Sequence, residues 1–358
     1  MAGDFFLLPD FSKVSSESRM STEQDESSQT PQVTIHHVAA CAGLSIASVS
    51  RALNGEKYVS EKTRQKVMEA VRELNYQPNY VARQMHRQKQ FSIGVVLGKD
   101  AGTYTPFAMK VYESLQASFQ QRGYRARQAQ FLKNGKLKDT SAGYITIGLH
   151  ESDPRYEVMH NSSSIVLDIG EARKSGLWVS SNDQQGGYLA TQHLIESGCR
   201  DIHFICLHEK HRVSRFRYHG YLDAIRQQGL TVYEPIAVGD DAGTPALDTY
   251  RSLTRLFQAG LKADGFVCFA DTLATGACSA ASDFGLKIPD DLSVIGYDGI
   301  VGYGNIDLSS IRQDIDGLAD SAAELLIDAM KSGEMKGRSL DVSLTAGKTT
   351  RPHKSIAI

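Results

Sequence analysis

The sequence predicts an α/β protein with two parts, a small all-α headpiece and a large core of two doubly wound parallel sheets. Residues 33–78 carry short helical patterns that Gly and Ser separate. From Phe91 to about Gly347, apolar strand patterns alternate with helical ones. Such alternation is typical of a parallel sheet with helices on both faces, and about 260 residues suit two such sheets rather than one.

The first 32 residues differ in composition from the rest of the chain. They are rich in Ser, Thr, Gln and acidic residues, and their low apolar content predicts disorder. Their short apolar patch has no basic region before it, which argues against a signal peptide. No run of about 18 apolar residues predicts a transmembrane helix, so we expect a cytoplasmic protein. The five cysteines form no CxxC pair, and we expect reduced, buried thiols.

The charge is distributed unevenly along the chain. Residues 33–90 carry nine Lys or Arg against four Asp or Glu, a net charge of +5, although the whole chain has a net charge of −2. A basic segment joined to an acidic body indicates a nucleic-acid-binding module fused to another domain.

Three short helices are predicted within this basic segment. Thr34 is a good N-cap for the first, and Gly43 is suited to the position just after its end. Ser45 caps the second helix, which Gly55 closes, and Ser60 caps the third. Two short helices around a tight turn, with a third helix to cover them, form a helix-turn-helix unit. A generic three-helix bundle would show the same pattern, but the basic charge and the tight turn favour DNA binding.

The core contains strand patterns that are almost continuously apolar, at 92–98, 142–149, 163–170, 201–207, 265–270 and 292–299. Helical patterns lie between most of them, at 108–123, 186–198, 216–229 and 272–285. Ligands of doubly wound sheets bind at the carboxyl ends of the strands. We therefore expect a small molecule to contact the residues that follow each strand.

Residues 33–85, "VTIHHVAACAGLSIASVSRALNGEKYVSEKTRQKVMEAVRELNYQPNYVARQM", resemble the headpiece of the lactose-repressor/galactose-repressor family of bacterial helix-turn-helix transcription regulators. The resemblance continues through "IGVVLG", "RYHGYLDAI", "IPDDLSVIGYDG" and "SSIRQD" and covers about residues 33–347. It implies a helix-turn-helix headpiece and a periplasmic-binding-protein-like core of two doubly wound parallel-sheet subdomains.

The resemblance also implies the domain boundaries. We expect a disordered tail at 1–32, a headpiece at 33–78, a hinge helix or linker at 79–90, a core at 91–347 and a C-terminal tail at 348–358. Within the core, the first subdomain would comprise about 91–195 plus 315–342. The second would comprise about 196–314 plus the C-terminus. Between Tyr124 and Gly143 the chain is roughly 15 residues shorter than in common family members, which indicates a truncated or missing helix.

The function implied is that of a sequence-specific DNA-binding regulator, a repressor of a carbohydrate-utilisation operon. A homodimer, or a tetramer, would bind a palindromic operator, and a sugar or sugar derivative in the core cleft would control it. A galactoside is the candidate effector. A regulator of this fold that answers to a non-sugar metabolite or a protein corepressor is the alternative. A sugar-binding protein without a transcriptional role is less well supported.

The resemblance assigns the recognition helix to the segment that Ser45 caps. Arg51 can form a bidentate contact with guanine, whereas Ile46 and Ala47 can make only apolar contacts, such as with a thymine methyl. In the hinge, Met85 falls where the family has a Leu that wedges into a base step, and Ala82 falls where close approach needs a small residue. The further candidates for DNA contact are Thr34, Ser45, Ser48, Ser50, Asn54, Tyr58, Ser60, Asn79, Tyr80 and Arg83.

Two residues correspond to the polar ligand contacts of the family, Arg217 in "RFRYHGY" and Asp298 in "IGYDG". An Arg and a carboxylate are the usual polar clamps for neighbouring hydroxyls. Phe107 would offer an apolar face to a sugar ring, and Asp183 and Asp271 are further candidates for effector binding. The sequence contains no nucleophile–base pair, carboxylate pair or metal cluster with usable spacing. We therefore expect neither an enzyme nor a cofactor or metal ion.

Overall fold

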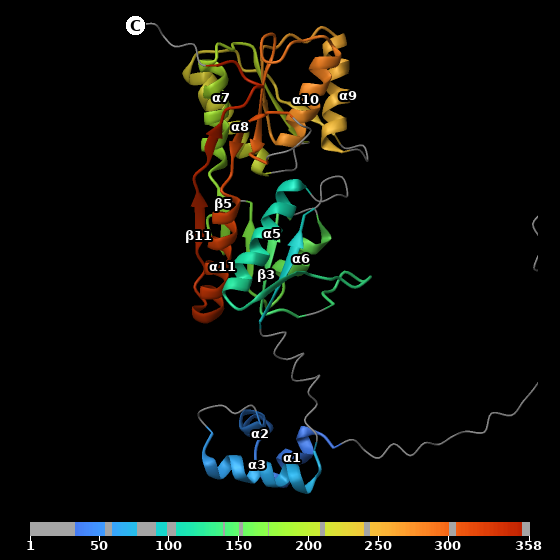
Figure 1. Ribbon diagram of the computed structural model, residues 1–358, viewed down its shortest axis with the longest axis vertical. Coiled ribbons are helices and arrows are strands. Elements are labelled where there is room, and N and C mark those ends of the chain that lie inside the picture. Colours follow the sequence, from blue (N-terminus) through green and yellow to red (C-terminus); the bar gives the residue numbers. More distant parts are fainter. Residues whose placement is uncertain are drawn as a thin grey trace, which may run out of the picture. The chain divides into compact units, whose positions relative to one another are not determined.

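The computed structural model describes residues 33–53, 59–76, 91–98, 105–138, 140–149, 153–170, 172–207, 212–239, 244–300 and 306–352 (Figure 1). The chain forms two compact units, one up to Arg83 and one from Gln84 onward. The predicted tail at 1–32 and the predicted hinge at 79–90 lie outside the described residues. Within the described ranges, no helix is both long and apolar enough to cross a membrane.

The first unit contains the three predicted headpiece helices, α1 (Ile35–Ala42), α2 (Ile46–Leu53) and α3 (Glu61–Glu73). The caps form as the sequence predicts. Ser45 Oγ accepts a hydrogen bond from the Ser48 amide at 3.1 Å, and Ser60 Oγ accepts one from the Thr63 amide at 3.2 Å. The three helices share one small core, made of Val38, Ala39, Val49, Ala52, Val67 and Ala70.

Helix α1 has a signal at each end. Gly43 adopts φ = 64° at its carboxyl end, a left-handed conformation that favours glycine. At the amino end, His37 Nδ1 accepts a hydrogen bond from the Thr34 amide at 3.0 Å. The imidazole therefore fills the place that an acidic or amide side chain takes in a capping box.

The second unit contains two six-stranded sheets. The first has the order β11-β5-β4-β3-β1-β2, and its strand pairs are all parallel. Its strands are β1 (Ser92–Leu97), β2 (Arg125–Gln128), β3 (Gly143–Ile147), β4 (Val166–Ile169), β5 (Trp178–Ser181) and β11 (Gly337–Leu340). Helices α5 (Pro106–Gln121) and α11 (Ile315–Ser332) pack together on one face, and α6 (Pro154–His160) packs on the other.

The second sheet has the order β12-β10-β9-β8-β6-β7, in which β12 alone is antiparallel to its neighbour. Its strands are β6 (Ile202–Leu207), β7 (Ile236–Val238), β8 (Gly265–Cys268), β9 (Ser293–Asp298), β10 (Ser309–Arg312) and β12 (Ser343–Thr345). Helices α7 (Asp183–Glu196) and α8 (Arg212–Gln227) pack on one face, and α9 (Pro245–Gln258) and α10 (Asp271–Asp283) pack on the other. The two doubly wound sheets confirm the predicted fold class (Figure 1).

One predicted boundary is wrong, because α7 belongs to the second subdomain and not to the first. Ala190, Leu194 and Ile195 of α7 lie in the apolar core of the second sheet. Glycines permit the close packing of α7 on α8. A Cβ on Gly187 would lie 1.9 Å from the Arg217 carbonyl oxygen, and one on Gly220 would lie 2.0 Å from the Gln184 carbonyl oxygen. The chain therefore crosses between the subdomains near residue 182 rather than after residue 195.

The predicted C-terminal tail also begins too early. Thr349 and Thr350 are 3% and 5% exposed. The Thr349 hydroxyl donates to the Val294 carbonyl at 2.7 Å, and the Thr350 hydroxyl lies 2.8 Å from His193 Nε2. These residues are therefore part of the second subdomain.

The shortened segment between β2 and β3 lacks a helix in its described residues. Phe131 and Leu137 form an antiparallel bridge across a short loop. Their side chains pack with Tyr144 and Met159 on the sheet face that α6 covers. The loop thus takes over part of the covering role that a helix has elsewhere in the sheet.

Asp168 fastens α6 to the first sheet. Its carboxylate accepts a hydrogen bond from the Thr146 hydroxyl and lies 3.1 Å from His160 Nε2 and 3.0 Å from Arg173 NH1. His160 Nδ1 lies 2.9 Å from the Tyr156 carbonyl oxygen. Because both ring nitrogens face acceptors, the imidazolium form satisfies both contacts. The hydrogen bond to Asp168 accordingly raises the pKa of His160 above 6.5.

This geometry predicts a pH-dependent contribution to stability. A raised folded-state pKa gives stability that is present below the unfolded pKa and is lost as the pH rises through the folded pKa. We expect the wild type to exceed His160→Gln in free energy of unfolding by up to about 1 kcal/mol at pH 6. The difference should be smaller at pH 9. Urea unfolding at both pH values measures it, with exposed His219→Gln as the control. A difference that stays constant with pH would contradict the assignment.

Candidate functional site

Helix α2 presents small, apolar and basic side chains on the surface of the headpiece. Ile46, Ala47 and Arg51 are exposed, and the exposed fraction of Ile46 is 42%. Val49 and Ala52 face the opposite way and are buried in the headpiece core. The helix therefore separates a packing face from a free face, as a helix that enters a DNA groove requires.

The remaining predicted DNA-contacting residues fall into two groups. Ser45 and Ser60 cap α2 and α3, Thr34 precedes α1, and Ser48 and Ser50 are half-buried on α2. Amide groups at a helix amino end attract phosphate oxygens, which suits the capping positions to backbone contacts. The other residues lie outside the part of the chain that the structure describes: Asn54, Tyr58, Asn79, Tyr80, Ala82, Arg83 and Met85.

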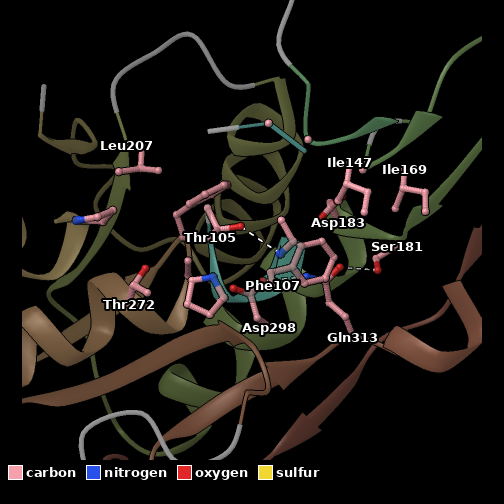
Figure 2. A pocket seen from close by; sticks show the side chains of 18 of the residues that line it. Thr105, Phe107, Ile147, Ile169, Ser181, Asp183, Leu207, Thr272, Asp298 and Gln313 are labelled. Carbon is pink, nitrogen blue, oxygen red and sulfur yellow. Dashed lines mark hydrogen bonds between the residues drawn. The ribbon is translucent and has the colours of Figure 1, made fainter. Parts of the chain in front are cut away.

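The second unit contains a cavity of about 310 Å³ at the carboxyl ends of strands from both sheets (Figure 2). From the first subdomain, the lining includes Phe107 of α5, Ile147 of β3, Ile169 of β4 and Ser180 and Ser181 of β5. From the second subdomain and its connections, it includes Asp183, Leu207, Arg217, Phe269, Thr272, Asp298 and Gln313. Four predicted effector residues therefore line one cavity, namely Phe107, Asp183, Arg217 and Asp298.

The side chain of Arg217 is buried in the cavity wall and has contacts on several sides. Its Nε donates to Asp183 Oδ1 at 2.7 Å, and its NH1 donates to the Phe269 carbonyl at 2.5 Å. NH1 also lies 3.7 Å from Asp298 Oδ1. The guanidinium carbon lies 3.5 Å from the centre of the Tyr297 ring. Arg217 thereby ties α8 to the amino end of α7 and to the ends of β8 and β9.

Asp298 combines an unusual backbone conformation with a perturbed carboxyl group. Its φ of 114° is one that side-chain-bearing residues rarely adopt. Burial, opposed by Arg217, raises the pKa of Asp298 to about 8, and burial also raises the pKa of Asp183. Strained backbone and shifted pKa values gather at functional sites, so Asp298 is a strong candidate for ligand contact.

Two further residues link Asp298 to the connections between the subdomains. Gln313 Nε2 donates to Asp298 Oδ1 at 2.7 Å, and Ser181 Oγ donates to Gln313 Oε1 at 2.6 Å. Ser181 and Gln313 lie where two chain crossings leave β5 and β10. Our sequence reasoning missed both, although "SSIRQD" and the predicted sites at strand ends were signals for them.

Asp271 does not line the cavity, in contrast to the prediction. Its carboxylate accepts hydrogen bonds from the Ser310 hydroxyl at 2.6 Å and from the Ile300 amide at 2.8 Å. Gly296 leaves room for it, since a Cβ there would lie 2.3 Å from Asp271 Oδ1. Asp271 is 2% exposed and holds the ends of β9 and β10 together behind the cavity wall.

The cavity offers binding groups rather than a reacting pair. Ser180 Oγ is buried without a hydrogen-bond partner in the described structure, and it lies in the cavity lining. Within the described ranges, no group of three or more His, Cys, Asp or Glu residues is arranged to hold a metal ion. The arrangement suits a small molecule with an apolar face and polar edges.

Two family profiles match the chain. The profile "Bacterial regulatory proteins, lacI family" matches residues 34–79, and "Periplasmic binding protein-like domain" matches residues 191–350. The chain is 31% identical over 316 residues to the HTH-type transcriptional repressor PurR of Actinobacillus pleuropneumoniae serotype 3 (strain JL03), covering 83% of this chain and 91% of that protein. It is 28% identical over 309 residues to PurR of Pasteurella multocida (strain Pm70), covering 82% and 91%.

Solved structures share the fold at lower sequence identity. A complex of the transcriptional regulator CelR with cellobiose aligns with a TM-score of 0.64 at 22% identity, covering 88% of this chain and 99% of that chain. The Lac repressor dimer bound to operator and the anti-inducer ONPF aligns with a TM-score of 0.65 at 22% identity, covering 89% and 99%. A LacI-family regulator from Enterococcus faecium with bound ribose aligns with a TM-score of 0.61 at 21% identity, covering 74% and 100%.

The family assignment rests on the match to the repressor from A. pleuropneumoniae, which is 31% identical and is covered over 91% of its length. The profile match at residues 34–79 coincides with the headpiece, and the second profile lies within the core. The chain belongs to the lacI family of bacterial regulatory proteins and is a DNA-binding transcriptional repressor.

Proposed function

We propose that this repressor acts in the cytoplasm on a carbohydrate-utilisation operon, binds a palindromic operator as a dimer, and is controlled by a sugar or sugar derivative in the core cavity. The observation that carries the proposal is the cavity itself. Its lining comes from both subdomains and combines an apolar side chain, Phe107, with the buried polar pair Arg217 and Asp298.

For DNA binding, the exposed face of α2 supports a role in the major groove. Arg51 would form a bidentate contact with O6 and N7 of a guanine. Ile46 and Ala47 would contact thymine methyl groups. Two headpieces of a dimer would read half-sites about one helical turn, or a multiple of it, apart. At the centre, Met85 and Ala82 would open the minor groove, so that the deformability of the central step adds to specificity.

For control by the effector, the contacts at the chain crossings support a coupling between ligand and subdomain arrangement. The chain of hydrogen bonds from Ser181 through Gln313 to Asp298 joins two crossings to the cavity wall. A ligand that binds more tightly to one arrangement of the subdomains shifts the population toward it. The same difference in affinity would change the fraction of repressor that is competent to bind the operator.

The size and chemistry of the cavity support a sugar as the effector. Its volume of about 310 Å³ lies at the lower end of the usual range of about 300–1,000 Å³. Phe107 can face a sugar ring, and carboxylates can accept hydrogen bonds from hydroxyls. Two of the solved structures with this fold contain sugars, cellobiose and ribose.

A non-sugar metabolite is the second candidate. The PurR relatives are more similar in sequence than the sugar-bound structures, and their name mentions no sugar. A flat heterocycle such as a purine base could also stack on Phe107. A protein corepressor would leave the cavity unused.

Selection of bound DNA sequences by the full chain, mapped to the genome, tests the carbohydrate assignment. The proposal predicts sites beside genes of sugar uptake or breakdown. Sites confined to genes of other pathways would contradict it. A thermal-shift screen against sugars, phosphosugars and purines complements this, and the absence of any response would favour a protein corepressor.

Arg51→Ala tests the recognition helix. Loss of one bidentate contact should reduce discrimination at one operator base by about 1–3 kcal/mol while leaving preferences at other positions intact. Binding-sequence selection with the variant measures this change. The control is Arg72→Ala on α3, which should weaken all sequences to a similar extent or not at all. If the variant kept the full base preference of the wild type, Arg51 would not be the base-reading residue.

Asp298→Asn tests the cavity. The amide keeps the size of the side chain but removes the carboxylate, so the operator affinity without ligand should stay within about twofold. The response to the effector should fall at least tenfold, because a hydrogen bond to a charged group is worth about 1.5–3 kcal/mol. Operator binding measured against effector concentration gives both values. Asp307→Asn, at an exposed carboxylate of the same subdomain, is the control. An unchanged response in Asp298→Asn would contradict the assignment.

A further inference from the structure

The charges around the cavity are unbalanced. Of the described residues that line it, Arg217 is the one that carries a fixed positive charge, whereas Asp183 and Asp298 carry carboxylates. A third carboxylate, Asp271, lies behind the wall and interacts electrostatically with Asp298. A ligand in this cavity would therefore meet more acidic than basic groups.

Arg217 is already committed to the protein. Its Nε and NH1 donate to Asp183 and to the Phe269 carbonyl, and its face lies against the Tyr297 ring. Only 5% of the residue is exposed. Turning the guanidinium toward a ligand anion would leave the buried Asp183 carboxylate without its partner, which is costly in a buried site.

The helix amino ends around the cavity supply little compensating positive charge. Helix amino ends attract anions through their free amide groups. However, α7 begins with Asp183 and α10 begins with Asp271, so each has a carboxylate at its own positive end. Helix α9 begins with a proline, which has no amide hydrogen, and carries Asp248 in its first turn.

The remaining helix at the cavity, α5, is also largely satisfied. It begins with Pro106, and the Thr105 hydroxyl accepts a hydrogen bond from the Ala108 amide at 3.1 Å. On the opposite wall, Ser180 Oγ is the buried group that has no described partner. A hydroxyl can pair with an uncharged donor or acceptor of a ligand as readily as with a charged one.

We propose that the effector is an uncharged molecule, and that a phosphate or carboxylate on the same scaffold is rejected. Its hydrogen-bonding groups bind Asp298 on one wall and Ser180 on the other. This inference rests on the proposed small-molecule control of the cavity. The raised pKa of Asp298, about 8, agrees with a wall in which negative charge already exceeds its compensation.

Matched pairs of neutral and anionic compounds test the proposal by calorimetric titration of the full chain. The pairs are galactose with galacturonate, ribose with ribose 5-phosphate, and hypoxanthine with purine-6-carboxylate. Galacturonate is close to galactose in size, so this pair separates charge from volume. In the pair that binds, we expect the anionic member to bind at least 100-fold more weakly than the neutral one. An anionic member that binds as tightly as its neutral partner, or more tightly, would overturn the proposal.

The same titrations separate this inference from the proposed function. Binding of hypoxanthine alone would remove the sugar assignment and support the uncharged effector. Binding of a sugar acid or sugar phosphate in preference to the neutral sugar would support the sugar assignment and overturn the inference. If no compound bound, both would fail.

Charge can also be changed on the protein side. In Asp298→Asn, the preference for the neutral member of the binding pair should shrink at least tenfold, because one acidic group is gone. In the control Asp307→Asn, the preference should stay as in the wild type. An undiminished preference in Asp298→Asn would show that the cavity carboxylate does not set the selectivity, and would overturn the proposal.

Discussion

The buried guanidinium of Arg217 is the contact on which the cavity wall of the second subdomain depends. It joins α8 to Asp183 at the start of α7, to the Phe269 carbonyl at the end of β8, and lies near Asp298 at the end of β9. Buried charges are tolerated where they are paired and hydrogen-bonded. One side chain therefore fixes the relative positions of several strand and helix ends, and it does so at the place where a ligand would bind.

The cavity wall is coupled to the chain crossings by hydrogen bonds that are themselves buried. Ser181, Gln313 and Asp298 form a continuous chain of side chains. A ligand that binds Asp298 therefore acts one contact away from two of the connections that a change in subdomain arrangement must bend. Glycines at the interface of α7 and α8 make the second subdomain a tightly packed body, which suits rigid movement about the crossings.

The sequence predicted much of the fold because many of its signals are local. Ser45, Gly43 and Ser60 mark the headpiece helices, and the apolar runs mark the six longest core strands. Short strands escaped prediction, since β2 reads Arg-Ala-Arg-Gln and has one buried residue. The side to which α7 belongs depends on close packing against α8. The position of Gln313 depends on a contact with Ser181, 132 residues away. Asp271 was placed correctly at a strand end, but its side chain turns toward Ser310.

Reciprocal linkage between operator and effector tests the account most directly. If the ligand in the cavity and the operator favour different subdomain arrangements, or the same one, each must change the affinity for the other by an equal factor. The measurement is the dissociation constant of the neutral ligand with and without saturating operator, compared with that of the operator with and without saturating ligand. The account predicts the same factor, different from one, in both comparisons. A ligand affinity that does not depend on the operator would contradict it.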